Sequence, residues 1–362
     1  MNKIRPQSVH GVVNRRQNTI FCYQGWPSVC RDENGTLYAV SSAFRTSHIC
    51  PFGKTALYIS RDEGKTWTPP IVVNDTYMDD RDTGILYMGN GRMLITWFTE
   101  DTSWCEETIK RNPDTALSAV KGMIDGYKNL PKDAAVGQRA YVRVSEDYGV
   151  TWSNITKVPV SAPHGPSLLK DGTLLYLGKE SDDMGSGRIA SCVSRDGGYT
   201  WTKIGIVDMP QGMKPSSFHE PHVTELADGS LFGMIRVHGA DEFPSFTMFS
   251  TRSADGGKTW TVPEPTGVNG SPPHLLLHSS GALICSYGKR DGDNIGDEHA
   301  MVSFDNGKTW RDDYILDDRC NNPDLGYPAT TELDDGSLIS VYYQQYADDS
   351  YTSILYTKWH LE

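Results

Sequence analysis

The sequence lacks a surplus of basic residues and any long apolar run, and each absence excludes a class of protein. Its 362 residues contain 34 Lys and Arg against 46 Asp and Glu, a formal charge of −12. Nucleic acids and anionic membranes require basic surfaces. No stretch of about 18 apolar residues could form a transmembrane helix. We therefore expect neither a nucleic acid nor a membrane as a partner.

Cysteine is sparse and follows no known pattern. The seven cysteines include no CxxC pair, so neither a disulfide framework nor a zinc ribbon is predicted, and buried free thiols are expected. The N-terminal residues lack the apolar segment of a signal peptide. A secreted protein whose signal had been removed would look the same, which leaves the cellular compartment open. Phosphate-loop, dinucleotide and serine-hydrolase motifs are also missing, so no cofactor is expected.

Glycine and aromatic residues are abundant, with 35 Gly, 9 Trp and 18 Tyr. This composition favours short strands joined by turns over helical bundles. The fold class is therefore predicted to be all-β.

One octapeptide, Ser-x-Asp-x-Gly-x-Thr-Trp, occurs five times. Its aspartate can accept backbone N–H groups across a tight turn, and its glycine supplies a positive φ. The tryptophan is expected to bury between neighbouring sheets, so the motif is interpreted as structural. The five copies are SRDEGKTW (60–67), SEDYGVTW (145–152), SRDGGYTW (194–201), SADGGKTW (253–260) and SFDNGKTW (303–310).

A second repeat, strand, polar-Gly turn and strand, occurs six times and predicts six hairpins. The turn glycines are Gly35, Gly91, Gly172, Gly229, Gly281 and Gly336. Six hairpins predict a six-bladed β-propeller, a single domain over residues 1–362, with the N-terminal segment supplying a strand that closes the ring. An insertion at about 100–138 enters the second blade, and its part 112–131 allows a short helix.

These Asp boxes on six hairpins resemble the sialidase (neuraminidase) superfamily over nearly the whole chain. The resemblance implies a Tyr nucleophile activated by a Glu, an Asp acid/base and three Arg that clamp the sugar carboxylate. Sialidases are a known Tyr exception among glycosidases.

Aligning the hairpins on their glycines places Trp26, Glu220, Pro272 and Tyr327 at one position of the innermost strands. The fourth hairpin resembles the family segment with the activating Glu and one clamp Arg, matched by Glu220 and Arg236. The sixth resembles the nucleophile segment, matched by Tyr327. A phenol loses its proton readily to a nearby carboxylate, and a phenolate repels an anionic sugar less than a carboxylate does. The alternative is that Tyr327 and Glu220 only cap the channel.

The family's arginine clamp is incomplete here. Gly25-Trp26-Pro27 replaces the usual Arg-Ile-Pro, and the fifth blade has Asp297, Glu298 and His299 where an Arg is expected. Arg45 and Arg290, at the ends of second strands, are candidates to bind an anionic group, with solvated loop positions as the alternative. No Asp occurs in the loop RTSHICPFGK, so His48 is the candidate general acid.

Several other side chains are expected around the axis. His164, His219, His222 and His299 fall near inner-strand starts or axial loops, which indicates sugar binding or acid/base chemistry. His219 and His222 are three apart in a strand and would point to opposite faces, so no metal site is predicted. Trp26 and Tyr343 could stack on a sugar ring or pack between blades.

The predicted function is an exo-acting glycoside hydrolase that removes a terminal sugar, sialic or not, from a glycan or oligosaccharide partner. Two alternatives stay open: a lyase acting next to a uronate carboxylate, and a propeller that binds glycans without turnover. The oligomeric state is left open.

Overall fold

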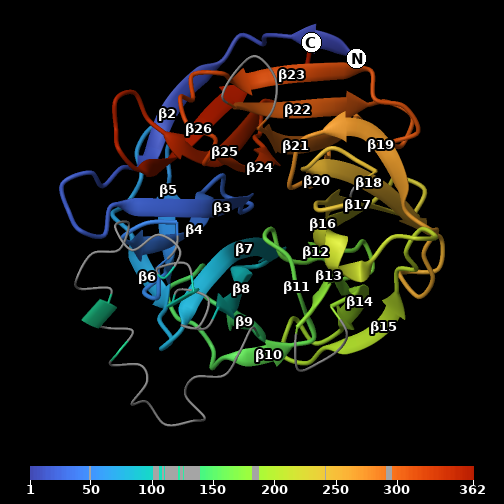
Figure 1. Cartoon of the computed structure of the whole chain (residues 1–362), viewed down its shortest axis with the longest axis horizontal. Helices are drawn as coiled ribbons and strands as arrows, with labels where there is room; N and C mark the ends of the chain where they lie inside the picture. Colours follow the sequence, from blue (N-terminus) through green and yellow to red (C-terminus); the bar gives the residue numbers. More distant parts are fainter. Residues whose placement is uncertain are drawn as a thin grey trace.

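The computed structural model describes residues 1–48, 50–100, 106–107, 110, 121–122, 125, 139–181, 187–240, 242–290 and 296–362. Six sheets, antiparallel except at one outer strand, stand around one axis as the blades of a propeller (Figure 1). Innermost strand first, the first three blades are β3 (Tyr23–Arg31), β4 (Leu37–Arg45), β5 (Lys54–Ser60) and β6 (Ile71–Asn74); β7 (Asp79–Gly89), β8 (Arg92–Glu100), β9 (Arg139–Ser145) and β10 (Thr156–Val158); and β12 (Ser167–Leu168), β13 (Leu174–Glu180), β14 (Ile189–Ser194) and β15 (Thr202–Ile206), with β11 (Val160–Ser161) also on β13. The other three are β16 (Phe218–Glu225), β17 (Leu231–Val237), β18 (Thr247–Ser253) and β19 (Glu264–Asn269); β20 (His274–Leu277), β21 (Leu283–Lys289), β22 (Asp297–Ser303), β23 (Asp312–Asp317) and β1 (Asn2–Ile4); and β24 (Gly326–Glu332), β25 (Leu338–Gln345), β26 (Thr352–Trp359) and β2 (Val9–Asn14). The six-bladed, all-β prediction is confirmed.

Two N-terminal strands close the ring. β2 pairs antiparallel with the C-terminal strand β26, as predicted. β1 pairs parallel with β23 in the fifth blade, which the sequence did not indicate. The N-terminal segment therefore covers the outer edges of two neighbouring blades, and covered edges cannot pair with other chains. We infer that residues 1–362 form a single domain.

The Asp boxes form the expected turns after the third strand of a blade. In the first box, Asp62 accepts the Thr66 backbone N–H at 2.9 Å and the Thr66 hydroxyl at 2.6 Å. Ser60 Oγ accepts the N–H of Gly64 at 2.9 Å, and Gly64 has a φ of 88°. These side chains bond within their own turn, which supports a structural role for the motif.

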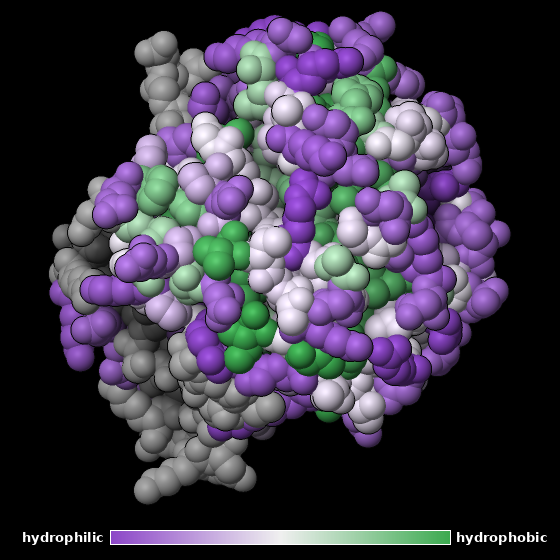
Figure 2. Space-filling view, turned by 90° about the vertical axis from the view of Figure 1, so that its right-hand side faces the viewer, coloured by the Kyte–Doolittle hydropathy of each residue, from purple (hydrophilic) through white to green (hydrophobic). Residues whose placement is uncertain are grey.

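The hydrophobic core consists of six clusters, one at each contact between neighbouring blades. Five of them are joined by an Asp-box tryptophan, which packs against the preceding blade while staying partly exposed: Trp67, Trp152, Trp201, Trp260 and Trp310. The sixth blade has no Asp box, and the fully buried Trp359 of β26 fills its contact with the fifth blade instead. The outer face seen in Figure 2 is mostly hydrophilic with small apolar groups, in keeping with a core that lies between the blades.

Ring closure should contribute measurably to stability. Val13 on β2 is 6% exposed and packs in the cluster between the first and sixth blades. Val13→Ala is expected to lower the free energy of unfolding by roughly 2 kcal/mol, because it removes buried methyl groups and leaves a cavity. Chemical denaturation measures this, and Val9→Ala on the same strand, where Val9 is 62% exposed, should change little. Equal effects of the two substitutions would contradict this role of β2.

The predicted insertion at 100–138 joins β8 to β9, the second and third strands of the second blade. Nearly all of it lies outside the described residues, but residues 121–122 and 125, which fall in the segment 112–131 where a short helix is predicted, are helical. In the part of the chain that the structure describes, no helix is long and apolar enough to span a membrane.

Candidate active site

Four innermost strands present a residue with a left-handed backbone at the same place. Trp26, Asp82, Glu220 and Tyr327 each lie nine residues before a turn glycine. Their φ angles are 53°, 49°, 47° and 54°, and the strand register shifts around each of them. Such backbone conformations cost about 1–3 kcal/mol each in non-glycine residues and cluster at functional sites. The shared irregularity brings four side chains from four blades to one place.

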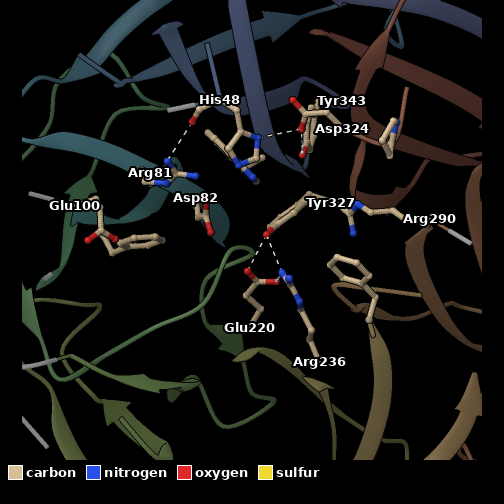
Figure 3. A pocket seen from close by; sticks show the side chains of 14 residues that line it. His48, Arg81, Asp82, Glu100, Glu220, Arg236, Arg290, Asp324, Tyr327 and Tyr343 are labelled. Carbon is tan, nitrogen blue, oxygen red and sulfur yellow. Dashed lines mark hydrogen bonds and ion pairs between the residues drawn. The ribbon is translucent and has the colours of Figure 1, made fainter. Parts of the chain in front are cut away.

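These four side chains line one cavity of about 550 Å³ (Figure 3). Its volume falls in the about 300–1,000 Å³ range of small-molecule sites. The lining residues are Trp26, His48, Arg81, Asp82, Phe98, Glu100, Glu220, Arg236, Phe246, Arg290, Pro323, Asp324, Tyr327 and Tyr343. Pro272, which shares the aligned position in the fifth blade, is not among them.

Tyr327, Glu220 and Arg236 form a closed triangle of hydrogen bonds. Tyr327 Oη donates to Glu220 Oε1 at 2.7 Å, and Arg236 Nη1 donates to Glu220 Oε2 at 2.6 Å and to Tyr327 Oη at 3.3 Å. Burial favours a higher pKa for Glu220, but the charge of Arg236 and the hydrogen bonds outweigh it and lower the pKa below its usual value. Burial, together with the nearby Glu220 charge, raises the pKa of Tyr327 far above the usual value. The phenol therefore rests protonated beside an ionised carboxylate.

Asp82 is a second carboxyl in the same cavity, with the opposite tendency. It is 6% exposed, and its Oδ1 has no hydrogen-bond partner among the described residues. Burial raises its pKa to about 7; the charge of Glu220 adds to this, while Arg81 opposes it. Two carboxyls whose surroundings push their pKa values apart are typical of acid and base roles. The sequence analysis missed Asp82, although it shares the nine-residue offset from its turn glycine that singled out Tyr327 and Glu220.

Three arginines, Arg81, Arg236 and Arg290, line the cavity. Arg236 pairs with Glu220, and Arg81 pairs with Asp79 at 3.3 Å. Arg290 donates instead to backbone carbonyls, at 3.1 Å to that of Ser271 and also to that of Leu325. No carboxylate of the described residues forms a close ion pair with Arg290, which brings positive charge to the cavity wall.

His48 lines the cavity from the first-blade loop. Its Nδ1 lies 3.0 Å from Asp324 Oδ1, and Asp324 also accepts hydrogen bonds from Tyr23 at 2.8 Å and Tyr343 at 3.0 Å. Partial burial of the ring lowers the pKa of His48 in spite of Asp324. Burial opposes ionisation of Asp324, but the bonds from His48 and the tyrosines lower its pKa. The pair therefore consists of a neutral imidazole and an ionised carboxylate near neutral pH.

Several predicted binding residues lie elsewhere. Arg45 is fully buried and bound by both nitrogens to Asp79, so it does not reach the cavity. His299 is 1% exposed and bonded to Asp313 at 2.8 Å. His164 is 3% exposed and packs against the rings of His222 and His274, outside the cavity lining. A substrate contact by these three predicted residues is not supported, because all three are buried and none lines the cavity.

The remaining candidates occupy the margins of the site. Trp26 is 2% and Tyr343 is 1% exposed, so packing between blades accounts for most of their surface, and stacking on a sugar is not supported. Arg81 stands 4.1 Å from the Trp26 ring centroid, a contact that fixes both groups. His219 lines a smaller adjoining cavity of about 90 Å³, which shares Asp82 and Glu220 with the main one.

The fifth-blade segment contains a buried carboxyl, that of Glu298. Glu298 is fully buried, and neither of its oxygens has a hydrogen-bond partner among the described residues. Burial raises its pKa well above 4.5, the usual value. A raised carboxyl pKa means that stability is greatest at low pH and is lost as the pH rises from the ordinary value through the raised one.

Glu298→Gln should therefore raise the free energy of unfolding at pH 8 by roughly 1–3 kcal/mol, because the folded state no longer carries a carboxyl that resists ionisation. Denaturation curves at pH 5 and pH 8 measure this, and the variant should depend less on pH than the wild type does. Glu264→Gln, at an exposed position, serves as the control. A variant with the wild-type pH dependence would show that Glu298 ionises freely.

The fold and the repeated turns define the chain as an Asp-box β-propeller. The BNR repeat-like domain model matches residues 127–340, more than half of the chain, and the BNR/Asp-box repeat matches residues 58–69. The chain therefore belongs to the BNR repeat-like family. None of the curated proteins matches it in sequence.

Solved structures share the fold at low identity. A protein of unknown function from Dyadobacter fermentans is 22% identical with a TM-score of 0.78, and the match covers 99% of both chains. A Hadza microbial sialidase is 17% identical with a TM-score of 0.68, over 98% of this chain and 68% of the other. The intramolecular trans-sialidase of Ruminococcus gnavus is 16% identical with a TM-score of 0.67, over 98% and 97%. At these identities the likeness concerns the fold alone.

Proposed function

We propose that the chain is a retaining exo-glycosidase that removes a terminal sugar bound in the cavity. The observation that carries this proposal is the 2.7 Å hydrogen bond from Tyr327 to the ionised Glu220. A phenol with a raised pKa is a poor nucleophile unless a base takes its proton during attack. Glu220 is positioned to be that base, and Arg236 to stabilise the charge that develops on the phenol oxygen.

The first step forms a covalent glycosyl-tyrosine. Tyr327 Oη attacks the anomeric carbon and passes its proton to Glu220, while the bond from that carbon to the leaving oxygen breaks. The leaving oxygen needs a proton, which an acid on the opposite side of the sugar must donate. Water then hydrolyses the glycosyl-tyrosine, and Tyr327 recovers its proton from Glu220. Two inversions at one carbon give net retention.

We assign the proton donor to Asp82 in place of His48, the candidate chosen from the sequence. A donor must hold its proton at the working pH. The pKa of Asp82 is about 7, so a large share of this carboxyl is protonated near neutral pH. The pKa of His48 lies below its usual value of 6.5, so its ring is mostly neutral there.

The arginines support an anionic sugar as the substrate. Arg290 has no carboxylate partner among the described residues, and a guanidinium in a partly buried site binds a carboxylate in two-pronged geometry. Arg81 and Arg236 bring further positive charge to the same cavity. Solved structures of sialidases share this fold, which agrees with a carboxylated sugar. The clamp differs from the family pattern in the first blade, so uronic acids belong among the candidates beside sialic acids.

A panel of 4-methylumbelliferyl glycosides tests the proposal directly. It should include N-acetylneuraminic, glucuronic and galacturonic acids and neutral hexoses, together with acidic polysaccharides analysed by mass spectrometry. We expect release of one monosaccharide whose first-formed anomer, read by NMR, keeps the configuration of the substrate. An unsaturated product absorbing in the ultraviolet would establish a lyase instead. Glycan binding without any turnover would establish a binding protein.

A further inference from the structure

The cavity contains a second proton-transfer pair that the first step does not use. His48 and Asp324 lie across Tyr327 from Glu220 in Figure 3. The His48 side chain is 46% exposed, whereas Asp82 is 6% exposed. Water that enters the cavity after the leaving group departs therefore meets His48 more readily than it meets Asp82.

The surroundings of His48 fix the position of its proton. An ionised Asp324 can only accept, so Nδ1 of His48, 3.0 Å away, must donate to it. Tyr23 Oη, also 3.0 Å from this nitrogen, gives its own proton to Asp324 at 2.8 Å. The single proton of the neutral ring is thus on Nδ1, and Nε2 carries a lone pair. No residue of the described part of the chain bonds to Nε2.

His48 also lies on the side of the cavity that hydrolysis requires. Arg81 Nη1 donates to the backbone carbonyl of His48 at 3.3 Å, and Arg81 is the neighbour of Asp82 in the chain. His48 and Asp82 therefore belong to one wall, formed by the first and second blades. With retention, water must attack from the face that the leaving group has left, which is the face of the proton donor.

We propose that His48 is the general base of the second step, positioned by Asp324, and that acid and base duties are divided between Asp82 and His48. This second step rests on the glycosidase function proposed above. His48 Nε2 takes a proton from water, and the water oxygen attacks the anomeric carbon. The bond from this carbon to Tyr327 Oη breaks, and the phenolate takes back the proton held by Glu220. Solvent then carries the proton from His48 to Asp82, which restores the resting enzyme.

The division predicts different kinetics for the two variants His48→Gln and Asp82→Asn. The probe is the 2,4-dinitrophenyl glycoside of whichever sugar the panel selects, because its leaving group needs no acid. His48→Gln should release about one equivalent of dinitrophenol per active site in a burst, followed by turnover about 10²-fold slower than wild type. Intact-protein mass spectrometry should find the sugar on the enzyme. Azide, which needs no base, should restore turnover and yield a glycosyl azide. Asp82→Asn should show neither the burst nor the response to azide.

Two further variants complete the experiment. Asp324→Asn should give the same burst with a smaller loss, since it disturbs only the orientation and tautomer of His48. His360→Gln, at an exposed position near the C-terminus, should give wild-type traces. An unaltered melting temperature separates a lost base from a damaged fold, and if His48→Gln is unstable, Asp324→Asn decides.

Loss of activity in both the His48 and Asp324 variants without a burst and without a response to azide would overturn the division of roles. A burst and azide rescue in Asp82→Asn instead would make Asp82 both the acid of the first step and the base of the second. If wild-type enzyme releases no dinitrophenol from any glycoside, the glycosidase proposal itself fails. These three results are distinguishable in the same assay.

Discussion

Tyr327→Phe is expected to lower kcat/KM on the preferred glycoside by about 10³-fold or more, because it removes the attacking oxygen while leaving the ring in place. The ring contacts of Tyr327 with Trp26 and Tyr343, at centroid distances of 6.4 and 6.0 Å, do not involve the hydroxyl. Glu220 and Arg236 still pair in the variant. Its fold should therefore persist, and its melting temperature should change little.

Steady-state kinetics and mass spectrometry check this result together. The trapped glycosyl-enzyme that a 2-fluoro glycoside forms with wild type should be missing from Tyr327→Phe. Tyr176→Phe is a matched control, because Tyr176 is buried and bonds the Ala162 backbone away from the cavity. Near wild-type turnover by Tyr327→Phe would exclude tyrosine as the nucleophile.

Asp82→Asn is expected to slow hydrolysis of natural glycans by about 10²–10⁴-fold, the usual contribution of a general acid. The loss should nearly vanish with a 2,4-dinitrophenyl leaving group. The sign of the pH dependence follows from the pKa of Asp82, which burial raises to about 7. Only the protonated acid donates, so wild-type kcat/KM should fall as the pH rises above about 7. Asp82→Asn, which has no such proton to lose, should lack this alkaline limb.

The neighbouring Asp80 offers a close control. It is also buried with a pKa raised by burial to about 7, but it bonds Asn74 and Thr76 and does not line the cavity. Asp80→Asn should keep the alkaline limb and the dependence on the leaving group. An alkaline limb that persists in Asp82→Asn would assign the donor to another group.

Much of the site could be predicted from the register of the repeats. The nine-residue offset from the turn glycine places Tyr327 and Glu220 at one equivalent position, and in the structure the two side chains are hydrogen-bonded. The same offset applies to Asp82, which the alignment overlooked because the family's acid was sought in the first-blade loop. Register could find these residues because side chains at one position of equivalent strands meet at the axis of a propeller.

The charged groups at strand ends were beyond such reasoning. Arg45 and Arg290 both end second strands, yet Arg45 is buried against Asp79 and Arg290 lines the cavity. Their difference depends on whether a neighbouring blade supplies a carboxylate, and the spacing along one blade does not contain that information. The same applies to His48, whose partner Asp324 lies 276 positions away in the chain.

The amino-acid sequence alone predicts the number of blades, the turns that join their strands and the closure by the N-terminal segment. Each of these follows from local patterns along the chain. Which arginines and histidines reach the cavity, and which protons they carry, was decided only in three dimensions. Burial and partners from other blades set the pKa values, and long-range packing alone brings those partners together.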